Sequence, residues 1–260
     1  MYLREKNLFK FSIERDFMQT TTNPELKKND LYKYINKADE LYKNNSFKDA
    51  ISFYLNAILI DRKSAESYFG LGICYKNLGE YEKAIKYLET ATELRNNYYE
   101  AYYELGICHQ LQGKACGAIK NFVQAIQSKP DSTEVILQLG ISHEICEEYD
   151  LALMIYQKLI ENSPDFEKAY EHKSALLMRF GNYREAGNIL NTLIKINPKY
   201  KSAYAGLGIC FEKLGQKDKA RRCYRKFLTF EEFSPQTDFI LERFNSNIEK
   251  VSNSRFAIVK

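Results

Sequence analysis

AESYFGLGICYKNLGEYEKAIKYLETATELRNNY, residues 65–98, decides the fold, because the chain repeats the pattern of this stretch at a fixed spacing of 34 residues. A Leu-Gly pair returns at one position of four units, and an Ala follows each of these glycines after twelve residues. Self-similarity at this period indicates a stack of helix–turn–helix units, none of which buries its apolar stripe alone. The recurring residues are Leu71-Gly72, Leu105-Gly106, Leu139-Gly140 and Leu207-Gly208, followed by Ala84, Ala118, Ala152 and Ala220.

Each unit reads as two amphipathic helices of about fourteen residues joined by a short turn. In residues 65–98, Tyr68, Leu71 and Tyr75 recur on one helical stripe, and a second stripe starts at Tyr81. Gly79 stands between the stripes, where a residue that tolerates positive φ ends a helix at little cost. The pattern therefore predicts helix pairs, with small residues at the positions where the two helices approach closely.

This pattern resembles the tetratricopeptide repeat, whose motif combines a large residue, Leu-Gly, aromatics, alanines and a proline at set offsets. The resemblance covers Leu31 to Phe230, in six copies without insertion or deletion. It implies an all-α fold, a right-handed α-solenoid of six 34-residue helix–turn–helix repeats with a C-terminal capping helix. The third unit carries most of the motif, at Tyr102, Leu105, Gly106, His109, Ala118, Phe122, Ala125 and Pro130.

The predicted organisation has three parts. Residues 1–30 are expected to form an N-terminal extension that is partly disordered or a short helix, because their apolar residues follow no clear period. Residues 231–260 form a capping helix and tail, because Ser234-Pro235 resembles a helix start and an apolar face follows it. Between them lie the six repeats, 31–64, 65–98, 99–132, 133–166, 167–200 and 201–230, and the capping face comprises Phe239, Ile240, Phe244, Ile248 and Val251.

Composition narrows the class of protein. The formal net charge is only +4 on 72 charged side chains, so the whole chain has no strong attraction for nucleic acid or anionic lipid. No stretch approaches the roughly 18 consecutive apolar residues of a membrane span, and the charged N-terminus does not resemble a secretory signal. The six cysteines lack the close-set pairs of a disulfide framework, which indicates reduced thiols and a cytoplasmic protein.

One face of the first helices is the candidate binding site. Offsets 2, 5 and 9 of each unit project away from the packed Leu-Gly side, at about 100° per residue. The tetratricopeptide resemblance implies that this side is a concave groove for a peptide. An apolar band edged by carboxylates suits a peptide that bears Lys or Arg. The glutamates are also favoured by the helix dipole alone, so a purely structural role stays open for them. The groove residues are Glu66, Glu100 and Glu134 in an acidic row, Phe69, Tyr103 and Leu137 in a large apolar row, and Ile73, Ile107 and Ile141 in an aliphatic row.

Other chemistry finds little support in the sequence. The Lys, Asn and Arg clamp by which this family holds a peptide carboxylate is absent from the corresponding positions of the first three units. The best metal candidates are Cys108, His109, His143 and Cys146, but both histidines occupy an offset that holds core aromatics elsewhere. The spacing of Ser, Cys, His and Asp supports no catalytic constellation. We therefore expect no catalytic residue, no metal and no cofactor.

Two functions remain compatible with the sequence. The leading one is a non-catalytic protein–protein interaction scaffold or adaptor that binds a peptide segment of a partner in its groove. The alternative is a regulatory or nucleic-acid-associated repeat protein that uses the basic last repeat, where residues 212–226 carry seven basic and two acidic side chains. A role as the non-catalytic partner of an enzyme and self-association both stay open, while a nucleic acid is the less favoured partner.

Overall fold

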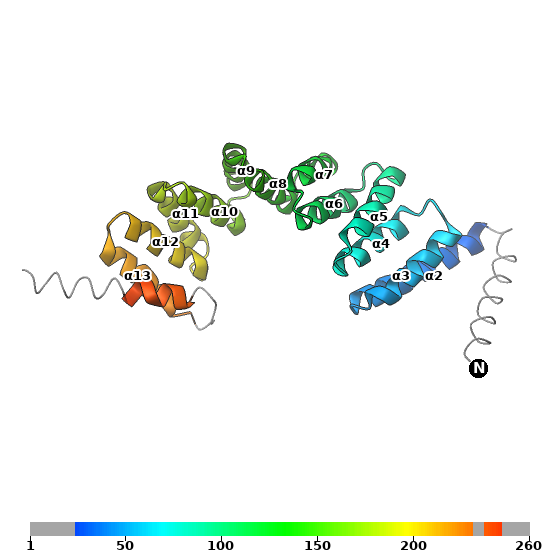
Figure 1. Cartoon of the computed structure of the whole chain (residues 1–260), viewed down its shortest axis with the longest axis horizontal. Coiled ribbons are helices and arrows are strands. Elements are labelled where there is room, and N and C mark those ends of the chain that lie inside the picture. The colour runs from blue at the N-terminus through cyan, green and yellow to red at the C-terminus, as the bar shows by residue number, and fades with distance from the viewer. Residues whose placement is uncertain (1–23, 231–236, 246–260) are drawn as a thin grey trace, which may run out of the picture. The chain divides into compact units, whose positions relative to one another are not determined.

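The computed structural model describes residues 24–230 and 237–245. Within these ranges the chain is helical and contains no strand (Figure 1). The helices follow one another as antiparallel pairs, which confirms the predicted all-α solenoid of consecutive repeats. The chain divides into two compact units, Met1–Asp131 and Ser132–Lys260.

The first unit holds three helix pairs. Its first helices are α2, α4 and α6, and each packs against the helix that follows it. Helices α4 and α6 also pack against the second helix of the preceding pair. The bounds are α2 Pro24–Lys43, α3 Phe47–Ile60, α4 Ala65–Asn77, α5 Tyr81–Leu94, α6 Tyr99–Leu111 and α7 Ala115–Ser128.

The second unit holds three more pairs and a C-terminal helix, residues 237–245. The first helices of its pairs are α8, α10 and α12. The bounds are α8 Thr133–Ile145, α9 Tyr149–Asn162, α10 Glu167–Arg179, α11 Tyr183–Ile196, α12 Lys201–Lys213 and α13 Lys217–Leu228.

The turn inside each pair depends on one residue with positive φ. Gly79 has φ of 76°, and Gly113, Gly181 and Gly215 take the same conformation in their own pairs. Asn45 fills the equivalent position of the first pair with φ of 59°. Helices of this kind end in a left-handed residue because it lets the chain turn while its amides bond the last carbonyls. The sequence prediction for Gly79 is confirmed.

The core of each pair is formed where a small residue of the first helix meets a large residue of the second. A Cβ added to Gly72 would lie 2.5 Å from Leu88, and one added to Gly106 would lie 2.4 Å from the Phe122 ring. Leu88 and Phe122 are fully buried. The glycine therefore lets the helix axes approach, and the large side chain fills the space that this approach leaves.

Helix α2 and the C-terminal helix are the first and last helices of the described chain. Helix α2 begins at Pro24, earlier than the Leu31 at which the repeat pattern starts, because proline is well tolerated in the first turn of a helix. At the other end, Ile240 is 1% exposed and packs with Tyr224 and Phe227, and Phe244 packs against the same cluster. The predicted capping helix is therefore present, although Phe239 stays 46% exposed. Residues 1–23, Ser234-Pro235, Ile248 and Val251 lie outside the described residues.

The cysteines follow the prediction only in part. Cys74, Cys108 and Cys210 share one repeat position and are buried free thiols, and Cys223 is a fourth free thiol. The expectation of reduced thiols is wrong for Cys116 and Cys146, both of which are disulfide-bonded. That expectation rested on spacing along the sequence, which does not report distances in the fold. In the part of the chain that the structure describes, no helix has the length and apolar character needed to cross a membrane.

Candidate functional site

In the first unit, the predicted groove residues lie on α4 and α6, the first helices of consecutive repeats. The two helices contact each other, and Lys76 Nζ lies 2.6 Å from Glu104 Oε2 between them. Phe69, Ile73, Tyr103 and Ile107 are all half-buried, and Glu100 is exposed. This face therefore presents apolar side chains that remain partly accessible.

Aromatic and charged neighbours fix part of this face. The Phe69 ring lies 5.1 Å from that of Tyr98, and the Arg95 guanidinium stacks 4.3 Å above the Tyr98 ring. Arg95 also donates a 2.8 Å hydrogen bond to Oε1 of Glu66. Tyr103 lies 6.1 Å from Phe122, centroid to centroid. The Glu66 carboxylate is thus already engaged within its own repeat.

In the second unit, the predicted residues Glu134, Leu137 and Ile141 lie on α8. Glu134 is paired with Lys168 at 3.3 Å, and Ile141 is half-buried. Leu137 is only 2% exposed and packs in a core cluster with residues of α9 and α10. The prediction of Leu137 as an accessible groove residue is wrong, because the following helices cover its side chain.

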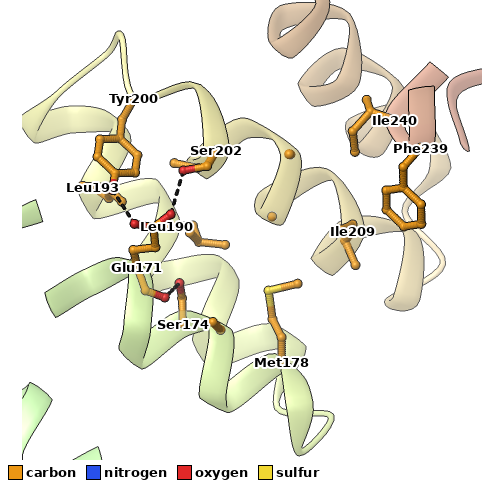
Figure 2. Close-up of a pocket in the computed structure, with 14 residues that line it drawn as sticks. Glu171, Ser174, Met178, Leu190, Leu193, Tyr200, Ser202, Ile209, Phe239 and Ile240 are labelled. Carbon is orange, nitrogen blue, oxygen red and sulfur yellow. Dashed lines mark hydrogen bonds between the residues drawn. The ribbon is translucent and has the colours of Figure 1, made fainter. Parts of the chain in front are cut away.

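A pocket of about 320 Å³ opens on the first helices of the fifth and sixth repeats. Helices α10, α11 and α12 and the C-terminal helix all contribute to its wall. Figure 2 shows Glu171, Ser174, Tyr200 and Ser202 at one end and Met178, Ile209, Phe239 and Ile240 toward the other. The pocket thus has a polar end and an apolar end.

Hydrogen bonds hold the polar end in place. Tyr200 donates its hydroxyl to Oε2 of Glu171 at 2.5 Å, and Ser202 donates to Oε1 at 3.0 Å (Figure 2). Burial, and then the hydrogen bond to Glu171, raises the pKa of Tyr200, so its hydroxyl stays protonated and acts as a donor. Each carboxylate oxygen accepts one of these bonds and has capacity for another. The Glu171 carboxylate is therefore held in one orientation by Tyr200 and Ser202.

Small side chains create the hollow. Ala175 and Ala205 occupy the offsets that hold Ile73 and Phe69 in the second repeat, and Gly206 follows Ala205. All three small residues line the pocket. Removing large side chains from two neighbouring positions leaves space that Met178, Leu190 and Ile209 border without filling. The pocket is therefore a property of the local sequence of these two repeats.

Comparison with known proteins agrees with the repeat pattern. Models of the tetratricopeptide repeat family match residues 65–98 and 177–226. These stretches lie in different units, and between them the same helix pairs continue in register. Residues 65–98 and 177–226 are therefore similar to the tetratricopeptide repeat family. Repeats of this family generally mediate protein–protein interactions.

Solved tetratricopeptide repeat structures share the fold. YrrB, described as a TPR protein with an unusual peptide-binding site, superposes with a TM-score of 0.58 at 20% identity, over 73% of this chain and 96% of its own. PilF of Pseudomonas aeruginosa gives 0.66 at 14% identity, over 85% and 98%. A tetratricopeptide repeat protein from Parabacteroides merdae gives 0.57 at 18% identity, over 95% and 94%. No curated protein matches the sequence significantly.

The pocket was not predicted from the sequence. The groove offsets were assigned from the second, third and fourth repeats, although the same offsets lead to Glu171, Ala175 and Ile209 in the fifth and sixth. The available signal was the change from large to small residues at offsets 5 and 9. Small residues at these offsets form a pocket only if no side chain of a neighbouring helix fills the space, and the sequence does not show this.

Within residues 24–230 and 237–245, no group of three or more His, Cys, Asp or Glu side chains lies close enough together to hold a metal ion. Among the candidates, His143 Nδ1 lies 2.5 Å from Glu148 Oε2. Burial lowers the pKa of His109, whose Nδ1 atom is buried without a hydrogen-bond partner. Both histidines thus serve in packing and local bonding at the ends of their helices.

Proposed function

We propose that this chain is a non-catalytic protein–protein interaction scaffold that binds an extended peptide segment of a partner on the first helices of its repeats. The observation that carries the proposal is the pocket of about 320 Å³ on α10, α11 and α12, with an oriented carboxylate at one end and apolar walls at the other. A peptide with a large apolar side chain and a nearby Lys or Arg matches this arrangement.

The face of the first unit supports the same mode of binding. Phe69, Ile73, Tyr103 and Ile107 are partly accessible on helices that contact each other. YrrB, whose fold this chain shares, is described as having a peptide-binding site, and we extend that kind of ligand to this chain as part of the proposal. The acidic residues of these faces disfavour a polyphosphate ligand, since like charges repel.

The alternative, a nucleic-acid-associated protein that uses α13, has weaker support. Several of the α13 cations already have partners within the unit. Arg221 pairs with Asp218, Lys219 lies 5.4 Å from the Phe211 ring centroid, and Lys226 lies 5.6 Å from that of Phe230. These contacts fit a solvated helix face better than a surface organised around a ligand.

Quantitative affinity capture with crosslinking in the cells of origin tests the proposal. The pocket variant is Ala175→Phe, which fills the hollow from an exposed position, and the groove variant combines Tyr103→Ala with Ile107→Ala. The controls are Asn191→Phe, an exposed position in α11 outside the pocket, and Arg221→Ala with Arg222→Ala. We expect one set of partners to be lost from the first two variants and kept by both controls.

Two outcomes contradict the proposal. Partners retained by both the pocket variant and the groove variant would remove both faces as binding sites. Loss of partners from Arg221→Ala with Arg222→Ala, together with binding that falls steeply as salt rises, would favour the nucleic-acid alternative.

A cytoplasmic location is the second part of the proposal, and the four free thiols at Cys74, Cys108, Cys210 and Cys223 support it. The disulfide bonds of Cys116 and Cys146 are unusual for a reducing compartment. Differential alkylation in rapidly quenched cells decides the matter. Reduced Cys116 and Cys146 agree with a cytoplasmic protein, and stable oxidation of both would place the chain in an oxidising compartment.

A further inference from the structure

The C-terminal helix contributes to the wall of the pocket and directly precedes residues 246–260 in the sequence. Phe239 and Ile240 of this helix line the apolar end, and the sequence continues through residues 246–260, which lie outside the described residues. From Phe239 to Asn245 the helix rises about 9 Å. The eleven residues from Asn245 to residue 256 can span up to about 40 Å, so the length of the chain allows residue 256 to reach the pocket.

The sequence of this tail matches the chemistry of the pocket. It ends in Arg255-Phe256-Ala257-Ile258-Val259-Lys260. Alternate side chains of an extended segment point to the same side, so Phe256, Ile258 and Lys260 would share one face if this segment were extended. Such a face would be apolar at Phe256 and Ile258 and cationic at Lys260. The pocket has its apolar end beside the C-terminal helix and its carboxylate, Glu171, toward the opposite end (Figure 2).

We propose that the tail of this chain, residues 255–260, is an internal ligand of the pocket. Phe256 and Ile258 fill the apolar end against Met178, Ile209 and Phe239, and the Lys260 ammonium binds the Glu171 carboxylate. The tail thereby competes with a partner peptide. This inference rests on the proposed function only in that both assign ligands to the same pocket.

Tethering makes such an interaction effective even when it is weak. A short flexible linker gives an effective concentration of about 1 mM. A tail segment with an intrinsic dissociation constant of about 0.1 mM would therefore occupy the pocket roughly ten times out of eleven. A partner peptide would have to bind correspondingly more tightly, or be present at higher concentration, to displace it.

Fluorescence of the full chain tests the proposal, because the chain contains no tryptophan. The variant Phe256→Trp places a single indole in the tail. We expect blue-shifted emission and protection from iodide quenching. Adding Ala175→Phe, or Lys260→Glu, to this variant should shift the emission to the red and expose the indole. The matched control, Asn191→Phe in the same background, should leave the emission unchanged, and circular dichroism should confirm that each variant is folded.

A synthetic peptide of residues 250–260 provides the second measurement. Added in excess to the Phe256→Trp protein, it should displace the tail and expose the indole. Two results would overturn the proposal. The first is an indole that iodide quenches fully in the Phe256→Trp variant alone, and the second is a protected indole that responds to neither Ala175→Phe nor the peptide. Such a result leaves the proposed function intact, because partner capture by the Ala175→Phe variant is measured separately.

Discussion

Gly208 and Tyr224 touch across the last helix pair, so closely that a Cβ added to Gly208 would lie 2.3 Å from Cε1 of the tyrosine ring. Tyr224 is fully buried and donates a 2.8 Å hydrogen bond to Glu212, which in turn binds Arg243 of the C-terminal helix. The ring is therefore held from both sides. The close packing at Gly208 thus places Tyr224 where its hydroxyl bonds Glu212, and Glu212 joins the sixth helix pair to Arg243 of the C-terminal helix.

Gly208→Ala should destabilise the protein by about 1 to 3 kcal/mol, because the ring cannot move without breaking the bond to Glu212. Urea denaturation followed by circular dichroism measures the effect. Gly187→Ala is the matched control, since its Cβ would lie at an ordinary 3.6 Å from Leu207 in the same unit. The control should gain up to about 1 kcal/mol, as helical Gly-to-Ala changes do. Equal effects of both substitutions would contradict the close contact at Gly208.

Removing the buried side chain of Ile240 from the C-terminal helix should also lower the stability of the protein. Ile240→Ala should cost about 2 to 4 kcal/mol, because the side chain is 1% exposed among Tyr224 and Phe227. Leu241→Ala, at a neighbouring position that is 37% exposed, should stay within about 0.5 kcal/mol. Hydrogen exchange of α12 and α13 localises the effect, and unchanged protection in Ile240→Ala would show that this helix does not cap the last repeat.

The ion pair between repeats should matter more than the one within a repeat. Lys76 and Glu104 are 19% and 18% exposed, whereas Arg95 and Glu66 are 46% and 45% exposed. Glu104→Gln should therefore cost about 1 to 3 kcal/mol, and Glu66→Gln less than about 1 kcal/mol. Denaturation at low and high salt checks the difference, because added salt screens the exposed pair more strongly. A larger effect of Glu66→Gln would contradict this ranking.

Stability should fall at alkaline pH. Burial raises the pKa of the Cys74 and Cys108 thiols to about 12 and that of Cys210 and Cys223 to about 11, from an ordinary value of 9.0. Above pH 9 the unfolded chain releases these protons while the folded chain keeps them, so the free energy of unfolding falls as pH rises from about 9 toward 12.

Urea denaturation at a series of pH values between 8 and 10 measures this slope. Cys108→Ala should weaken the pH dependence whatever its effect on stability at pH 8. A slope identical to that of the unmodified chain would show that the Cys108 thiol does not titrate differently in the two states.

The sequence by itself determined the repeat architecture. The 34-residue period, the positive-φ glycines such as Gly79 and the apolar stripes are local patterns, and each follows from the geometry of a single helix or turn. The sequence also predicted the capping helix, because an apolar helix face beyond the last repeat has to pack against that repeat. Ile240 of this face is buried against Tyr224 and Phe227. Helical periodicity states which side of its own helix a residue occupies.

Only the tertiary structure decided what lies opposite that side. Leu137 and Tyr103 share one repeat offset, yet Leu137 is buried by the helices that follow it and Tyr103 stays partly accessible. The pocket arises because Ala175 and Ala205 leave space that α11 and the C-terminal helix border but do not fill. Accessibility and cavity volume depend on the side chains that neighbouring helices bring to a position, and those distances are set by packing, which no single repeat encodes.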